Sequence, residues 1–174
     1  MATKHTLVAL VEDKPGVLNA ISSLFRRRGF NIDSIAVGHS EQPNLSRVTI
    51  VVNGSPAVME QARKQLNKII EVIKTFDIKP DESVARELSL IKVKATPETR
   101  SEIMQIVSVF RANIIDVAHD SLTVEVTGDE NKVDSLFHLL QSFGIKEMAR
   151  TGRIAMTRGT MEPLPEGREA HNEQ

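Results

Sequence analysis

Residues 11–25 read VEDKPGVLNAISSLF and join a predicted strand, residues 6–11, to a predicted helix. Apolar residues recur along this helix at a spacing typical of one helix face: Val17, Leu18, Ile21, Leu24 and Phe25. Pro15 is tolerated near the first turn because its missing N–H has no helical partner there. The same strand–turn–helix pattern recurs in the second half of the chain.

The turn before this helix is suited to an amino acid. Gly16 has no side chain, so a ligand can approach the backbone closely. The first N–H groups of a helix lack partners and carry partial positive charge, which suits a carboxylate. Asp13 can accept hydrogen bonds from an ammonium group, so an acceptor lies beside a set of donors. Taken alone, Asp, Pro and Gly before a helix are more often only a cap and a turn.

The following segments complete a β-α-β-β-α-β order. Residues 30–37 and 47–52 are predicted strands, and Ser55 and Pro56 are predicted to start a second helix. Residues 72–78 form the last strand. This order fits a ferredoxin-like sandwich, in which two helices cover one face of a four-stranded antiparallel sheet. Val and Ile on both sides of residues 47–52 predict that the second face is also covered.

The second half of the chain repeats this order after a polar segment that is typical of a linker. Pro97 follows Pro15 at the same interval at which Asn113 follows Asn31. Residues 145–157 are predicted to form one long last strand. We therefore predict an α+β protein of two tandem ferredoxin-like (βαββαβ) domains. The predicted ranges are residues 1–78, a linker at 79–83, a second domain at 84–158 and a disordered tail at 159–174.

The two halves differ where a ligand would bind. Gly16 corresponds to Glu98 in the second half, and Leu18 corresponds to Arg100. A carboxylate side chain at a helix N-terminus competes with a carboxylate ligand for the same N–H groups. We therefore expect the small-molecule site in the first domain, and a docking or dimerising role for the second.

Composition narrows the function further. The 174 residues carry a net charge of −1 and contain no Cys, Trp or Tyr. With a net charge this small, no overall electrostatic field attracts the protein to nucleic acid or to an anionic membrane. The small number of aromatic residues disfavours binding of single-stranded nucleic acid by base stacking. The absence of Cys excludes disulfides, thiolate catalysis and Cys-based zinc sites. The first residues lack the long apolar core of a signal peptide, and no apolar run reaches about 18 residues, so we expect a cytoplasmic protein.

No catalytic or metal-binding residue can be assigned. The five histidines are not arranged as in metal-binding motifs: His5, His39, His119, His138 and His171. The phosphate-binding and nucleophile motifs GxGxxG, GxxxxGK[ST] and GxSxG are also absent from the sequence. The absence of these motifs does not exclude an enzyme, but it leaves no residue to which a catalytic role can be assigned.

The most specific motifs of the first half are RRRGFNIDSIAVG, residues 26–38, and LSRVTIVV, residues 45–52. With these motifs, the first half resembles the ACT domain of acetolactate synthase (acetohydroxyacid synthase) small regulatory subunits. The resemblance continues through NIIDVAHDSLTVEVTG, residues 113–128, to ARTGRIAMTRG, residues 149–159. It implies a noncatalytic subunit in branched-chain amino acid (valine, isoleucine, leucine) biosynthesis. Such a subunit activates its catalytic partner and confers feedback inhibition by valine.

The resemblance also implies the effector site. The family's effector-binding residues correspond to Asp13, Lys14, Pro15, Gly16, Val17, Leu18, Asn31 and Ile32. Many relatives have Asn where this chain has Asp13, and an ionised Asp only accepts hydrogen bonds, whereas Asn also donates them. ACT domains commonly pair side by side, so the effector is expected at a homodimer interface. There the loop of one subunit faces Asn31 of the other.

The implied partner is the large catalytic subunit of acetolactate synthase. No cofactor is expected in this chain, whereas thiamine diphosphate, Mg²⁺ and FAD are expected in the catalytic partner. Two alternatives remain at this point: a free-standing ACT regulator of transcription or of another enzyme, and an independent enzyme on the same scaffold. The first lacks a helix-turn-helix motif or basic stripe.

Overall fold

The strand and helix predicted at the start of the chain are both present in the computed structural model, which describes residues 3–159. The described residues divide into two units, residues 3–84 with 153–159, and Ala85–Gly152. The first unit contains β1 (Thr3–Glu12), α1 (Val17–Arg28), β2 (Ile32–His39), β3 (Leu45–Gly54), α2 (Pro56–Leu66) and β4 (Val72–Ile78). This is the predicted βαββαβ order.

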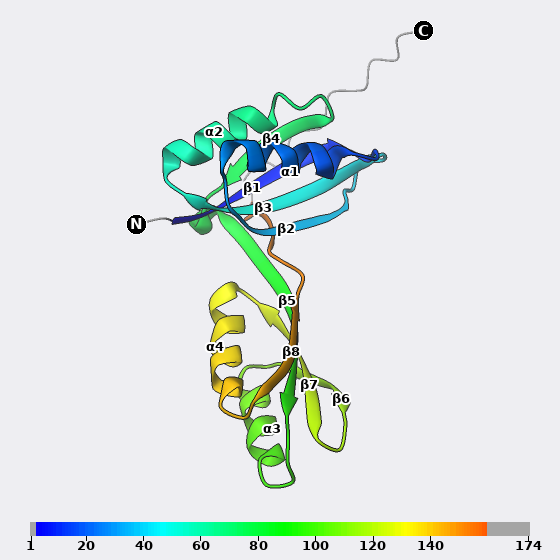
Figure 1. Ribbon diagram of the computed structural model, residues 1–174, viewed down its shortest axis with the longest axis vertical. Coiled ribbons are helices and arrows are strands. Elements are labelled where there is room, and N and C mark those ends of the chain that lie inside the picture. The colour runs from blue at the N-terminus through cyan, green and yellow to red at the C-terminus, as the bar shows by residue number, and fades with distance from the viewer. Residues whose placement is uncertain (1–2, 160–174) are drawn as a thin grey trace. The chain divides into compact units, whose positions relative to one another are not determined.

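The first unit is a ferredoxin-like sandwich. Its strands lie in the order β2-β3-β1-β4, and each neighbouring pair is antiparallel. The helices α1 and α2 cover one face of this sheet (Figure 1). The α1 residues Val17, Ile21 and Phe25 pack there against strand residues such as Ile50. Leu18 was predicted on the buried face but is 47% exposed, because it lies in the first turn of α1 beside an open hollow at the edge strand β2.

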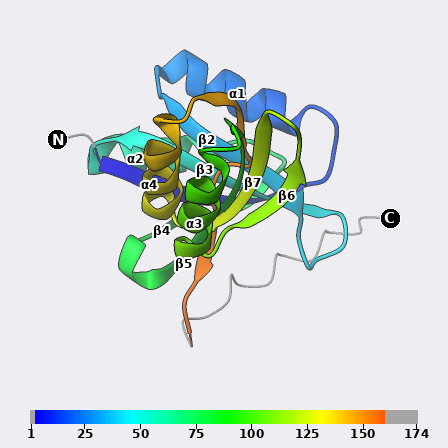
Figure 2. The same ribbon diagram turned by 90° about the horizontal axis from the view of Figure 1, so that it is seen from below.

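The second unit repeats this architecture. It contains β5 (Ser83–Lys94), α3 (Arg100–Val109), β6 (Asn113–Val117), β7 (Ser121–Gly128), α4 (Glu130–Gln141) and β8 (Ile145–Arg150). The strands follow the order β6-β7-β5-β8, with antiparallel neighbours. The two helices lie over one face of this sheet (Figures 1 and 2). Ile103 of α3 and Leu136 of α4 are fully buried in the second core, and the fold class is therefore confirmed.

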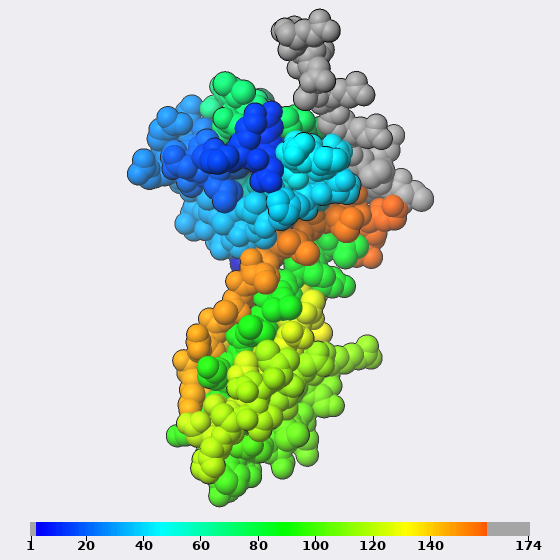
Figure 3. All heavy atoms as spheres, turned by 90° about the vertical axis from the view of Figure 1, so that its right-hand side faces the viewer, coloured from blue at the N-terminus to red at the C-terminus, as the bar shows by residue number. Residues whose placement is uncertain are grey.

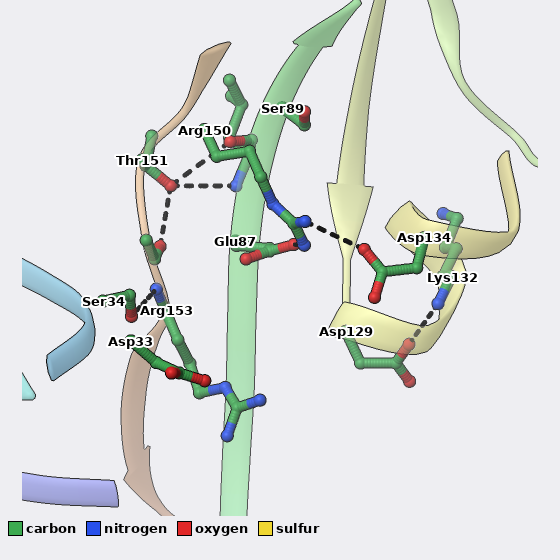
Figure 4. A network of polar contacts seen from close by, with 12 residues as sticks. Asp33, Ser34, Glu87, Ser89, Asp129, Lys132, Asp134, Arg150, Thr151 and Arg153 are labelled. Atoms are coloured by element: carbon green, nitrogen blue, oxygen red, sulfur yellow. Dashed lines mark hydrogen bonds and ion pairs between the residues drawn. The ribbon is translucent and has the colours of Figure 1, made fainter. Parts of the chain in front are cut away.

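A polar network fixes β8 to its neighbours in the second unit. Arg150 of β8 pairs with Glu87 of β5, and its other terminal nitrogen donates to Asp134 of α4 at 2.9 Å (Figure 4). The Glu87 side chain is only 8% exposed. A carboxylate that is buried to this extent requires a paired cation. The Arg150 side chain supplies this cation and thereby links β8 to β5 and α4.

The end of the chain differs from the prediction. The single strand predicted over residues 145–157 is two strands, β8 and β9 (Ile154–Thr157), and β9 groups with the first unit. Gly152 lies between them at φ +83°, a backbone conformation that interrupts an extended strand. The second unit therefore ends at Gly152, whereas the predicted second domain, residues 84–158, continued past it.

The boundary between the two halves also differs. Pro80–Glu82 forms a short 3₁₀ helix, η1, and Ser83 already begins β5. The predicted linker, residues 79–83, is thus structured, because Pro80 at the first position favours a helical turn. Of the tail predicted at residues 159–174, residues 160–174 lie outside the described range.

Candidate functional site

The turn between β1 and α1 leaves the start of the helix without a side-chain cap. Gly16 is the N-cap residue at φ +90° and ψ −12°, and no side chain accepts a hydrogen bond from the first turn. A Cβ at Gly16 would meet no heavy atom within 4 Å, so the space beside the residue is open. The first N–H groups of α1 are therefore accessible to an anionic group.

A hollow of about 230 Å³ lies at this turn. Residues 11–18 line it, together with Val37 of β2 and Ser46 and Val48 of β3. The volume is below the range of roughly 300–1,000 Å³ that drug-sized ligands occupy. Because valine and leucine side chains supply most of its apolar wall, the hollow suits a small molecule with a compact aliphatic part.

Asp13 places a carboxylate on the rim of this hollow. Its backbone N–H donates to the Asn44 carbonyl at 2.9 Å, which fixes the loop to the β2–β3 connection. One carboxylate oxygen accepts from the Ser46 hydroxyl at 3.4 Å, and the other lies 3.4 Å from His39 Nδ1. The side chain is 49% exposed. It therefore retains accessible lone pairs that an ammonium group can use.

Lys14 is paired with its neighbour at the mouth of the hollow. Lys14 Nζ lies 2.6 Å from Glu12 Oε2, and the hydrogen bond that it donates to this carboxylate raises the pKa of the Lys14 ammonium. Both residues line the hollow. Since Lys14 is already engaged by a carboxylate, the backbone donors of α1 are the better partners for a ligand carboxylate.

The predicted site residues separate into two groups. The loop residues Asp13, Lys14, Pro15, Gly16, Val17 and Leu18 all line the hollow. Asn31 and Ile32 do not: Asn31 is exposed just before β2, and Ile32 is partly buried against the helix-side core. Within one chain, therefore, the structure brings the loop together and leaves Asn31 and Ile32 apart from it.

The sequence reasoning missed the strand residues that line the hollow. Val37 is the cross-strand partner of Val48, and Ser46 is the partner of both Val11 and His39. Residues in register on neighbouring strands point to the same face. The alternation along β3 shows which residues share a face, but the register that brings them beside the loop follows from the fold.

The corresponding turn in the second unit has other contacts, although α3 also lacks a side-chain hydrogen bond at its N-cap, Thr99. Thr96 and Thr99 exchange hydrogen bonds before α3, from Thr96 N to Thr99 Oγ1 at 2.9 Å and from Thr99 N to Thr96 Oγ1 at 3.3 Å. Hydrogen bonds from Thr96 and from its own backbone N–H lower the pKa of Glu98. Arg100, the counterpart of Leu18, donates to the carbonyls of Ala118 and His119 at 3.0 and 2.9 Å. The two turns therefore differ in their side-chain contacts, and the expectation that only the first unit binds a small molecule stays a prediction.

Two further searches of the described part of the chain bear on function. Among residues 3–159, no group of three or more His, Asp or Glu side chains converges to hold a metal ion. The helices within that range are also too short or too polar to cross a membrane.

Two family models match the chain in succession. Residues 7–74 match the acetohydroxyacid synthase (AHAS) small subunit-like ACT domain, and residues 86–159 match a model described as the small subunit of acetolactate synthase. The first match spans β1 to β4 and contains the hollow. The second begins within β5.

Sequence relatives and a solved structure agree with these matches. A probable acetolactate synthase small subunit of Archaeoglobus fulgidus is 56% identical over 90% of this chain and 98% of its own length. The acetolactate synthase small subunit of Mycolicibacterium smegmatis is 52% identical over 89% of this chain and 91% of its own length. The crystal structure of the acetolactate synthase small subunit from Thermotoga maritima superposes with a TM-score of 0.85, at 45% identity. The superposition covers 90% of this chain and 98% of the Thermotoga maritima chain.

Proposed function

The chain belongs to the family of acetolactate synthase small subunits, and on this premise we propose that it is a noncatalytic regulatory subunit that activates the catalytic chain and confers inhibition by valine. The process served is branched-chain amino acid biosynthesis. The observation that carries the regulatory part is the hollow beside the uncapped N-terminus of α1.

A branched-chain amino acid matches the chemistry of this hollow. Its carboxylate would accept hydrogen bonds from the first N–H groups of α1 near Gly16, where the helix dipole favours negative charge. Its ammonium group would donate to Asp13, which already accepts from Ser46. Its aliphatic side chain would pack against Val37 and Val48. The polar ends fix the orientation, and the apolar wall selects a compact branched side chain.

We further propose that a second copy of the chain completes the site. β2 is an edge strand of the first sheet. Beside the hollow, Leu18, Ile35 and Val37 are 47%, 38% and 48% exposed. Pairing of two β2 edges would cover these side chains and satisfy the free backbone groups of the edge. It would also bring Asn31 of one copy toward the loop of the other, which accounts for its separation from the loop within one chain.

The second unit is the proposed docking module for the catalytic chain. Large apolar side chains are exposed on α3 and on the edge strand β6, at Met104, Val109, Ile115 and Val117. In the turn before α3, Thr96 and Thr99 bond to each other and Arg100 bonds to the Ala118 carbonyl, whereas the first unit has Gly16 and Leu18 at the positions of Glu98 and Arg100. Thiamine diphosphate, Mg²⁺ and FAD are assigned to the catalytic partner, and the small chain supplies none of that chemistry.

Reconstitution tests this function. The purified small chain is expected to form no acetolactate from pyruvate alone, to raise the rate when added to the catalytic chain, and to make that rate sensitive to L-valine. A small chain that turns over pyruvate unaided, or that leaves the catalytic chain unaffected, would contradict the proposal.

Ser46→Ala is expected to weaken L-valine binding without abolishing it. The substitution removes the hydroxyl that holds the Asp13 carboxylate at 3.4 Å. Loss of one hydrogen bond to a partly exposed charged group costs about 1 kcal/mol, or about fivefold in affinity. Calorimetric titration measures the change, and Ser46→Thr, which keeps the hydroxyl, serves as the matched control. Equal affinities for the alanine variant and the unsubstituted chain would show that Ser46 does not position Asp13.

A further inference from the structure

The face of the first sheet turned away from α1 and α2 is buried. On β1 and β3, the residues that alternate with the helix-side core include Val8, Leu10 and Thr49, each at most 2% exposed. Val8 pairs with Thr49 and Leu10 pairs with Arg47 across the two strands, so these four side chains share this face. The prediction that the second face is covered is thus confirmed.

β9 lies against this face and is held there by side chains of the sheet. Arg47 Nη2 donates to the Ala155 carbonyl at 2.6 Å, and Arg153 Nη1 donates to Thr6 Oγ1 at 3.3 Å. The backbone N–H of Arg153 donates to Ser34 Oγ at 3.3 Å (Figure 4). The space-filling view shows the orange residues of this segment against the first unit (Figure 3). Ala155 is 5% exposed, so a small residue lets the strand approach closely.

Arg47, which bonds to β9, lies on β3 between two residues that line the hollow. Side chains alternate between the two faces of a strand, so Ser46 and Val48 point to one face and Arg47 to the other. Ser46 and Val48 line the hollow. A ligand in the hollow would therefore contact Ser46 and Val48 on one side of the sheet, whereas β9 contacts Arg47, the residue between them, on the other side.

The strength of the hydrogen bond from Arg47 to the Ala155 carbonyl depends on the position of the guanidinium. The guanidinium is partly buried, and this burial lowers the pKa of Arg47 from its ordinary value. A desolvated cation gains most from a short, well-aligned acceptor and loses most when that acceptor moves away. A small shift of residues 46–48 would therefore change how firmly the Ala155 carbonyl is held.

We propose that β9 is the output element of the first unit: occupancy of the hollow shifts Ser46 and Val48, and Arg47 transmits the shift to β9. From β9 the effect passes along the chain through Gly152 into the second unit. This inference rests on the proposed function. It requires that the ligand bind unequally to two arrangements of residues 46–48, since only such a difference can shift their populations.

Arg47→Met tests the proposal, because methionine keeps much of the apolar length of the side chain and removes the donors. We expect L-valine to bind the isolated variant with unchanged affinity by calorimetry. In the complex with the catalytic chain, the valine concentration for half-inhibition should rise about tenfold or more, within the range of such couplings. Activation without valine should persist. Arg63→Met is the control: Arg63 pairs with Glu60 on the surface of α2, and its loss should change neither binding nor inhibition.

A second measurement uses the unsubstituted chain, and it tests the proposed role of β9 even if Arg47→Met does not fold. Hydrogen–deuterium exchange of residues 153–158 is expected to change when saturating L-valine is added. Unchanged exchange there, or full valine inhibition of a folded Arg47→Met complex, would overturn the role of β9 while leaving the proposed function in place. Failure of L-valine to bind the unsubstituted chain would overturn both.

Discussion

Gly16→Asp is expected to remove inhibition by L-valine while leaving activation of the catalytic chain intact. The substitution places a carboxylate at the uncapped N-terminus of α1, where the ligand carboxylate is proposed to bind. The space beside Gly16 is open, so the new side chain can be accommodated there. Like charges in close contact cost several kcal/mol, which corresponds to about 100-fold or more in affinity.

The control for this variant is Gly29→Asp at the other end of α1. Both glycines have positive φ, +90° at Gly16 and +68° at Gly29, and neither would bring a Cβ within 4 Å of another atom. Each substitution should therefore cost a similar 1–2 kcal/mol of backbone strain. Calorimetry and inhibition assays should show valine binding lost only in Gly16→Asp. Retained inhibition in that variant would contradict the placement of the site.

Charged substitutions on the exposed apolar surface of the second unit are expected to abolish activation. Val109 of α3 is 79% exposed and Val117 of β6 is 62% exposed. An aspartate carboxylate that is buried unpaired at such a contact costs about 3–5 kcal/mol. The double variant Val109→Asp, Val117→Asp should therefore bind the catalytic chain at least about 100-fold more weakly. Analytical ultracentrifugation and the activation assay both measure this loss.

Two controls distinguish a loss of binding to the catalytic chain from a loss of folding or of L-valine binding. L-valine binding to the isolated double variant should be unchanged, because the hollow lies in the first unit. Ser135→Asp, an exposed substitution on α4 of the same unit, should leave docking intact. If the double variant still activates the catalytic chain fully, the docking surface does not include Val109 and Val117.

The sequence predicted the fold well because the local signals agree with one another. Ser55 and Pro56 were predicted to start the second helix, and Ser55 Oγ accepts from the Val58 N–H at 3.4 Å with Pro56 at the first position. The periodic apolar residues of α1 and the alternation along β3 both appear as predicted, apart from Leu18. Each of these features depends on residues within a few positions of one another.

The features that were missed depend on residues far apart in the chain. Ser46 and Val48 lie beside the loop at residues 13–18 only because β1 and β3 pair in one register. The position of β9 combines the positive φ of Gly152, pairing with β5 and the bond from Arg47 to Ala155. A glycine within a predicted strand can mark a bulge as well as a bend, so the sequence alone did not indicate that the strand ends there.

Asn31 illustrates a different limit. The resemblance placed it in the effector site, yet in one chain it is exposed and apart from the hollow. Its proposed role depends on a second copy of the chain. The site as a whole was therefore predictable where its residues are contiguous, and incomplete where strand register or a partner chain brings residues together.

A crystal structure of the chain grown with excess L-valine tests the central claim most directly. We expect the amino acid in the hollow, with its carboxylate at the N–H groups that follow Gly16 and its ammonium group at Asp13. Valine bound elsewhere on the protein, or this hollow left empty at saturating concentration, would contradict the account.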